Sequence, residues 1–317
     1  MTLRPAQGEP RAARVAFLGL GHMGLPMAKN LAAAGHDVVG FDVFPAAVEA
    51  AREAGIDVAS SGTDAVRRQA REPGAVVITM FQSGAQVIDA YRGAGGAEGL
   101  LAVAAPGTLF IDSSTIAVDE ARGAHALAEA AGHRSIDAPV SGGVVGAENA
   151  TLAFMVGGSD EDFEAARPFL EAMGRRIVHC GGAGLGQAAK VCNNMILAVS
   201  QIAVAEAFVL GERLGLTHQA LFDVASNASG QCWALTTNCP VPGPVPTSPA
   251  NRDYQPGFAG TLMSKDLGLA EQAIDLTGVD ARMGRLAREI YRDFADGPGA
   301  GQDFSGVINT IRAESAG

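Results

Sequence analysis

Six residues near the N-terminus constrain the fold of this chain more than any other feature. They are Gly19-Leu20-Gly21-His22-Met23-Gly24, with the spacing GxGxxG, and they separate the apolar run 15–18 from a helical pattern. In this context the first glycine permits a tight turn, the second lets the backbone approach a pyrophosphate, and the third lets helix and strand pack closely. The helix start offers free N–H groups to phosphates, and His22 and Met23 are expected to contribute theirs. The hexapeptide therefore predicts a dinucleotide site rather than an ordinary glycine-rich turn.

The residue after the second apolar run, 38–41, indicates which dinucleotide is bound. Asp42 stands there, where a carboxylate accepts hydrogen bonds from adenosine ribose hydroxyls and repels a 2′-phosphate. Phe44 occupies a position where proteins that bind NADP tend to have arginine. NAD is therefore the expected cofactor, and NADP is disfavoured.

The first 180 residues or so alternate between strand and helix patterns. Apolar runs typical of strands buried on both faces occur at 15–18, 38–41, 76–79 and 109–111, with helical patterns at 23–34, 45–54, 85–91 and 118–131. This order predicts an α/β fold, a Rossmann-type, doubly wound and mostly parallel sheet. Strands at 151–156 and 176–179, on either side of a helix at 160–173, are expected to extend the sheet.

Strand patterns cease near Gly181-Gly182. One helical pattern without proline runs from 184 to about 214, and others cover 219–227, 261–277, 282–295 and 304–311. The segment 238–256 has prolines at 240, 242, 244, 246 and 249 and is predicted to be a non-helical loop. We therefore expect a flexible tail (1–13), a NAD-binding domain (14–181), and an all-helical domain for substrate binding and oligomerisation (182–317), joined by the long helix.

Charge and cysteine content exclude several classes of function. The net charge is −11 and no Lys/Arg cluster occurs, which argues against a nucleic-acid partner. The four cysteines lack metal-ligand spacing, so we expect no metal and reduced thiols in the cytoplasm. The N-terminus has no apolar signal core, and we expect no membrane span because no apolar run approaches the roughly 20 residues that one needs. A small carboxylate substrate remains compatible with an acidic protein.

The use of lysine points to a reacting group. The chain has three lysines, Lys29, Lys190 and Lys265, within a total of 23 Lys and Arg. Unlike arginine, lysine can lose its proton when desolvated, and oxidation of an alcohol needs a base for the hydroxyl proton. Lys190 lies near the start of the long helix among Ala, Val, Cys and Asn, where the helix N-terminus favours the neutral amine. A surface lysine is the alternative interpretation.

Other polar groups have weaker signals of their own. Asn194 follows Lys190 by one helical turn, on the same face. Ser141-Gly142-Gly143 is able to present successive N–H groups to a carboxylate, although an ordinary loop has the same pattern. Lys265-Asp266 is by itself more often a solvated turn. Trp233 is a residue type usually found in cores, but it follows Gly230-Gln231 at a loop entrance, so we expect it to form a wall of the substrate pocket.

Together these segments resemble the β-hydroxyacid dehydrogenase family over residues 15–311. The motifs are FLGLGHMGLPMAKNL (17–31), IDSSTI (111–116), DAPVSGG (137–143), GLGQAAKVCNN (184–194) and the block at 229–270. The resemblance implies an NAD-dependent oxidoreductase that forms a homodimer or homotetramer. The block at 229–270 is most similar to members that oxidise 3-hydroxyisobutyrate to methylmalonate semialdehyde in valine catabolism.

The resemblance also implies roles for individual residues. It makes Lys190 the acid/base and Asn194 a substrate-orienting residue. It assigns Ser141, Gly142 and Gly143 to the substrate carboxylate and Thr115 to the nicotinamide. It assigns Lys265 to the cofactor ribose, with Asp266 contacting Lys265. Further implied contacts with the cofactor are those of Met80, Phe81, Gln82 and Gln86. The family pattern has Leu-Pro at 81–82 and Asn at 86, so the shape of this loop is in question.

Two alternatives remain open from the sequence. The same fold is able to act on tartronate semialdehyde, succinic semialdehyde, serine or 3-hydroxypropionate, because one methyl group in a pocket discriminates by only about 1–3 kcal/mol. A non-catalytic NAD-binding sensor or scaffold would have the same fold. The presence of Lys190 disfavours that second alternative.

Overall fold

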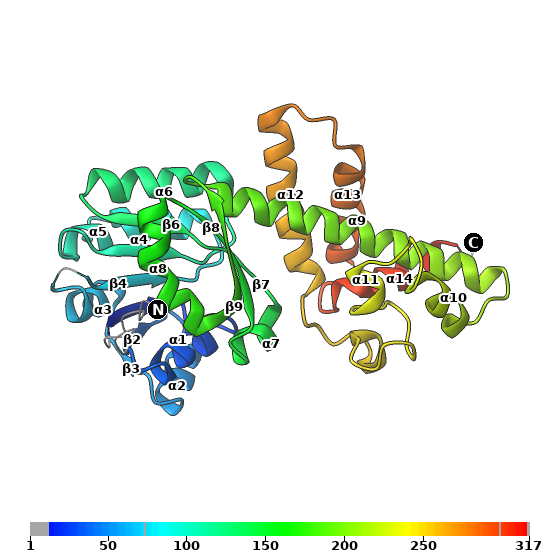
Figure 1. Ribbon diagram of the computed structural model, residues 1–317, viewed down its shortest axis with the longest axis horizontal. Coiled ribbons are helices and arrows are strands. Elements are labelled where there is room, and N and C mark those ends of the chain that lie inside the picture. Colours follow the sequence, from blue (N-terminus) through cyan, green and yellow to red (C-terminus); the bar gives the residue numbers. More distant parts are fainter. Residues whose placement is uncertain (1–12, 73, 298, 316–317) are drawn as a thin grey trace, which may run out of the picture. The chain divides into compact units, whose positions relative to one another are not determined.

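The computed structural model describes residues 13–72, 74–297 and 299–315 (Figure 1). The expected tail therefore lies outside the described residues, apart from Ala13. The chain divides into two compact units, Met1–Lys190 and Val191–Gly317.

Unit 1 contains a nine-stranded sheet with the order β3-β2-β1-β4-β5-β6-β8-β7, and β9 pairs with β8. The strands are β1 (Arg14–Leu18), β2 (Asp37–Phe41), β3 (Asp57–Val58), β4 (Val76–Thr79), β5 (Leu109–Asp112), β6 (Arg134–Asp137), β7 (Val140–Ser141), β8 (Leu152–Gly157) and β9 (Gly174–Gly181). The helices are α1 (Gly24–Ala33), α2 (Pro45–Glu53), α3 (Gly62–Gln69), α4 (Gly84–Arg92), α5 (Leu100–Val103), α6 (Val118–Ala130), α7 (Gly143–Glu148), α8 (Asp160–Met173) and the start of α9 (Leu185–Arg213).

The first six strands are parallel, and their order 3-2-1-4-5-6 is that of dinucleotide-binding sheets. β8 runs antiparallel to β6 and β7, while β9 is parallel to β8. The predicted doubly wound, mostly parallel sheet is thus confirmed, including its extension by the two strands around α8. The sequence pattern missed β3 and β7, which have two residues each, and β6, which has polar residues at both ends.

Two apolar cores cover the two faces of this sheet, and β1 contributes alternately to each. Val15 and Phe17 pack with buried residues of α1 and α8. Ala16 and Leu18 pack with residues of α3, α4, α5 and α6 on the opposite face (Figure 1). Burial on both faces explains why the parallel strands are continuous apolar runs rather than alternating ones.

Unit 2 is helical in the part of it that the structure describes, as expected. Beyond the remainder of α9 it has α10 (His218–Ala225), α11 (Trp233–Thr236), the 3-10 helix η1 (Pro249–Arg252), α12 (Gly260–Thr277), α13 (Arg282–Asp296), the 3-10 helix η2 (Phe304–Gly306) and α14 (Val307–Glu314). Its apolar core includes Phe208, Leu267, Tyr291 and Phe304.

The proline-rich segment 238–256 is mainly loop, but the expectation of no helix was wrong at η1. Pro249 occupies the first position of that short helix, where a missing N–H leaves no hydrogen bond unmade. The segment is fixed by Asp303, which accepts hydrogen bonds from the Asn238 side chain and from the N–H groups of Gly257 and Phe258. A defined loop therefore follows α11.

α9 corrects the expectation that no segment has the length and composition of a membrane span. The helix has 29 residues, and its most apolar window satisfies both criteria. Half of that window is buried inside the protein. A core helix of a water-soluble protein passes the same test, so this observation is weak support for a membrane role.

Candidate active site

The glycine fingerprint connects β1 to α1, and the presence of glycine at each of its three positions has a different explanation. Gly19 has φ +95°, and a Cβ there would lie 2.2 Å from the Met80 carbonyl oxygen. A Cβ on Gly24 would lie 1.8 Å from the Gly19 carbonyl oxygen. Gly21 has no heavy atom within 4 Å of an added Cβ. The protein itself therefore requires the first and third glycines, whereas the open space at Gly21 is suited to a ligand.

The start of α1 fits the phosphates of a dinucleotide. Its N-cap residue, Met23, makes no side-chain hydrogen bond to the first turn, and this turn contains no acidic residue. The N–H groups at a helix start carry positive potential and bind phosphate oxygens. The open backbone at Gly21 and this helix start are together suited to a pyrophosphate, whose binding here remains a prediction. His22 is exposed, and Met23 is half-buried.

Asp42 lies at the end of β2, beside the fingerprint. One carboxylate oxygen accepts a hydrogen bond from the N–H of Leu20 at 2.7 Å, and the other accepts one from the N–H of Phe44 at 2.8 Å. The carboxylate thus supports the fingerprint loop in addition to its predicted contact with a ribose. The Phe44 side chain is 62% exposed, so it is free to contact an adenine base.

The adjacent loop departs from the family pattern in residues that bond to one another. Ser83 caps α4 by accepting a hydrogen bond from the N–H of Gln86, and the Gln86 side chain accepts one from the N–H of Gln82. Met80 and Phe81 are half-buried where β4 ends. Gln82 and Gln86 therefore give this loop a capped helix start of its own, and their contacts with the cofactor remain predictions.

A buried polar network underlies the ends of β4 and β5. One oxygen of Asp112 accepts hydrogen bonds from the hydroxyls of Thr79 (2.8 Å) and Ser114 (2.6 Å), and the Ser114 hydroxyl accepts one from the N–H of Phe81 (2.8 Å). The other Asp112 oxygen has no hydrogen-bond partner among the described residues. Burial and, to a smaller extent, the charge of Asp137 raise the pKa of Asp112 to about 6, although hydrogen bonds from Ser114 and Thr79 oppose the shift. Sequence analysis missed this residue.

The raised pKa of Asp112 predicts a pH-dependent stability. The native protein binds a proton more tightly than the unfolded chain, so this group contributes more stability as pH falls from above 6 toward 4, about 3 kcal/mol in all. About 1.4 kcal/mol of this is expected between pH 7.5 and pH 5. Urea unfolding of the wild-type protein and of Asp112→Asn at both pH values measures it. A stability difference between the two proteins that does not change with pH would contradict the assignment.

The Ser141 segment turns sharply from β7 into α7. Gly142 and Gly143 have φ of +131° and +61°, values that favour glycine. Ser141 ends β7, and Gly143 begins α7. The ordinary loop that was the alternative interpretation is therefore confined to one residue, Gly142, between a strand and a helix. Binding of a substrate carboxylate by these three residues remains a prediction.

Lys190 is buried near the start of α9, with 7% of its surface exposed. The alternative of a surface lysine was wrong. The carboxylate of Asp137, at the end of β6, accepts hydrogen bonds from the N–H groups of Gly184 and Gln187, both at 2.8 Å. Because a Cβ on Gly186 would lie 2.4 Å from the Met155 carbonyl oxygen, the helix has to begin with glycine at this point. The start of the helix that carries Lys190 is therefore fixed against the sheet.

In unit 2, Asn194 and Asp266 form a buried pair. The Asn194 amide donates a hydrogen bond of 2.5 Å to the Asp266 carboxylate, and its oxygen accepts one from Asn193. Asp266 therefore orients Asn194, a contact that the sequence did not reveal. The neighbouring Lys265 is half-buried in α12. Trp233 is 52% exposed at the start of α11, so the interpretation of Trp233 as a core residue was wrong.

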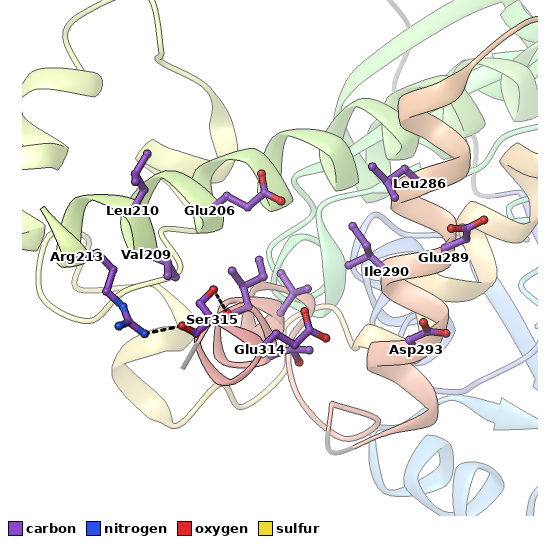
Figure 2. Close-up of a pocket in the computed structure, with 13 residues that line it drawn as sticks. Glu206, Val209, Leu210, Arg213, Leu286, Glu289, Ile290, Asp293, Glu314 and Ser315 are labelled. Carbon is purple, nitrogen blue, oxygen red and sulfur yellow. Dashed lines mark hydrogen bonds between the residues drawn. The ribbon is translucent and has the colours of Figure 1, made fainter. Parts of the chain in front are cut away.

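A hollow in unit 2 does not contain the predicted site residues. Figure 2 shows this space of about 660 Å³, which is lined by residues of α9, α13 and α14. Its lining includes Glu206, Glu289, Asp293 and Glu314, together with Arg213, which donates a hydrogen bond to the Ser315 carbonyl oxygen. Four carboxylates against one guanidinium disfavour binding of a carboxylate substrate. The hollow is not a candidate active site.

The fold and the fingerprint define a dinucleotide-dependent oxidoreductase, and comparisons with known proteins agree. The model for the NAD-binding domain of 6-phosphogluconate dehydrogenase matches residues 14–182. The model for the NAD-binding domain of NADP-dependent 3-hydroxyisobutyrate dehydrogenase matches residues 184–311. The chain therefore binds NAD.

Individual relatives identify the family. A Mycobacterium tuberculosis 3-hydroxyisobutyrate dehydrogenase, solved with L-serine, is 56% identical with a TM-score of 0.89, over 95% of this chain and 99% of that one. The mitochondrial 3-hydroxyisobutyrate dehydrogenase of Mus musculus is 43% identical over 95% of this chain and 87% of its own length. The NAD-dependent L-serine dehydrogenase of Pseudomonas aeruginosa is 47% identical over 93% and 96%. The chain belongs to the 3-hydroxyisobutyrate dehydrogenase family and is an NAD-dependent hydroxyacid dehydrogenase.

Proposed function

We propose that the chain oxidises 3-hydroxyisobutyrate to methylmalonate semialdehyde, a step of valine catabolism, with Lys190 as acid/base. The observation that carries the proposal is the burial of Lys190 at the start of α9, in a chain whose relatives include 3-hydroxyisobutyrate dehydrogenases of Mycobacterium tuberculosis and Mus musculus. A desolvated amine is able to act as a base, which arginine is not.

The proposed chemistry assigns the proton and the substrate to separate groups. NAD, held by the fingerprint and Asp42, supplies the hydride acceptor. The neutral amine of Lys190 accepts the proton of the substrate hydroxyl, so that the carbinol becomes an aldehyde with the loss of one hydride and one proton. The N–H groups of Ser141, Gly142 and Gly143 bind the carboxylate. Asn194, oriented by Asp266, keeps the substrate in register, with Thr115 at the nicotinamide, Lys265 at the ribose and Trp233 at the pocket wall.

L-serine is the second candidate substrate. It is also a 3-hydroxy acid, with an ammonium group where 3-hydroxyisobutyrate has a methyl group. The relative from Pseudomonas aeruginosa is an L-serine dehydrogenase, and the solved Mycobacterium tuberculosis relative contains L-serine. The two substrates therefore differ in charge at the substituent by which a binding pocket would distinguish them.

A panel of substrates tests the proposal. We expect kcat/KM to be highest for 3-hydroxyisobutyrate, with serine, 3-hydroxypropionate and the other small acids lower by about 10–200-fold. NAD should support faster oxidation than NADP, since the Asp42 carboxylate repels a 2′-phosphate. Higher kcat/KM for L-serine would replace the substrate assignment. Binding of NAD without turnover of any member of the panel would favour a sensor or scaffold.

We also propose a homodimer or homotetramer in the cytoplasm. Support comes from large apolar side chains on the helices of unit 2 that are about half or more exposed, namely Ile196, Leu210, Leu276, Met283 and Leu286. Exposed apolar residues on neighbouring helices are typical of association surfaces. The four cysteines are free thiols, which favours a reducing compartment. A monomer in sedimentation equilibrium at micromolar concentration would contradict the oligomer.

A further inference from the structure

We propose that Gln187 is a positioning residue that holds the Thr115 segment against the turn of α9 preceding Lys190. The inference rests on the proposed function, because it assumes that Thr115 contacts the nicotinamide and that Lys190 removes the proton. In this role Gln187 fixes the position of the Thr115 segment relative to the turn of α9 that precedes Lys190.

The side chain of Gln187 bridges both flanks of Thr115. Its amide nitrogen donates a hydrogen bond of 2.7 Å to the Ser114 carbonyl oxygen, and its amide oxygen accepts one of 3.3 Å from the N–H of Ile116. The side chain is 0% exposed. Removing either bond would leave a buried backbone group without its partner, which is strongly unfavourable. This two-point attachment restricts both the distance of the Thr115 segment from α9 and its tilt relative to that helix.

The other end of the attachment is equally constrained. The backbone N–H of Gln187 is held by Asp137, which also accepts a hydrogen bond of 3.1 Å from His125 on α6. Lys190 follows Gln187 by three residues, less than one helical turn, so the two side chains leave the helix on neighbouring directions. Residues at the ends of β5 and β6 thereby fix the position of the turn of α9 that precedes Lys190. All of these residues belong to unit 1.

This geometry predicts a defect in catalysis rather than in cofactor binding. Gln187 makes no hydrogen bond to the fingerprint or to Asp42 among the described residues, so the contacts proposed for the NAD phosphates and ribose should be retained. A displacement of about 1 Å between reacting groups lowers the rate of chemistry by about 100-fold. Hydride transfer should therefore become slower, and its share in limiting turnover should increase.

The test is Gln187→Met, which has similar length and no amide. We expect kcat to fall by about 100-fold, NADH binding measured by fluorescence to be retained, and the deuterium isotope effect on kcat to increase with substrate deuterated at the carbinol carbon. Amide exchange at Ile116 should be faster in the cofactor-free protein. Gln187→Glu keeps the acceptor for Ile116 but loses the donor to the Ser114 carbonyl oxygen, so it should also lower kcat.

Gln201→Met is the matched control. Gln201 lies on the same helix, is 0% exposed, and has an amide without a hydrogen-bond partner among the described residues. The kcat and the isotope effect of the Gln201→Met protein should therefore equal those of the wild type. Faster exchange in Gln187→Met or Gln187→Glu with wild-type kcat and isotope effect would overturn the positioning role. Absence of turnover by the wild-type protein would instead contradict the proposed function, whatever the exchange data show.

Discussion

Replacement of Lys190 with alanine is expected to lower kcat by about 10²–10⁴-fold, the usual contribution of a positioned acid/base. The side chain is buried near the start of a helix whose first turn is fixed by Asp137. Its loss removes the group that accepts the hydroxyl proton, but no part of the glycine fingerprint. NADH affinity, measured by fluorescence titration, should therefore remain near that of the wild type.

Lys29→Ala provides the control for this prediction. Lys29 lies on the exposed surface of α1, so the same substitution should leave kcat unchanged. A Lys190→Ala protein that retains more than about a tenth of wild-type kcat would remove Lys190 from the acid/base role, since proton transfer contributes far more than this. Measuring kcat across pH would then locate the group that titrates instead.

Alanine at Gly21 and at Gly24 should have opposite consequences. An added Cβ at Gly21 meets no atom of the protein, so folding stability should be unchanged while the affinity for NAD falls about tenfold or more, equivalent to about 1.4 kcal/mol. An added Cβ at Gly24 would meet the Gly19 backbone at 1.8 Å. There we expect a loss of about 3 kcal/mol of folding stability.

Thermal unfolding of the cofactor-free proteins and calorimetric titration with NAD separate the two effects. The pair is informative because both substitutions add one methyl group within the same hexapeptide. Equal loss of stability in both variants would mean that Gly21 has a structural role. Unchanged NAD affinity in Gly21→Ala would mean that the pyrophosphate binds elsewhere.

The fold was predictable wherever burial on both faces imposed a clear pattern. β1, β2, β4 and β5 are mainly apolar because helices cover them on each side, and their apolar runs determine the doubly wound class. β6 escaped notice because Arg134, Ser135 and Asp137 interrupt its apolar character. Asp137 is polar because it fixes the start of α9. A local pattern cannot reveal a requirement that comes from a segment about 50 residues away.

For the candidate site, the sequence indicates residues whose type is chemically unusual, namely Lys190 among arginines and the glycines of GxGxxG. It does not indicate a common residue that acts through distant partners. Gln187 bonds to residues more than 70 positions earlier in the chain, and Asp112 is unusual only through its burial. One signal was present: Gln187 is the sole polar residue between Leu185 and Lys190.

The double hydrogen bond of Asp42 has a consequence for redesign of cofactor preference. Exchange of this carboxylate for a neutral or basic side chain would remove the repulsion of a 2′-phosphate, but it would also leave the N–H groups of Leu20 and Phe44 without their acceptor. A variant meant to use NADP therefore needs a second substitution that supplies a new acceptor to the turn. Single substitutions of Asp42 should lower the affinity for both NAD and NADP.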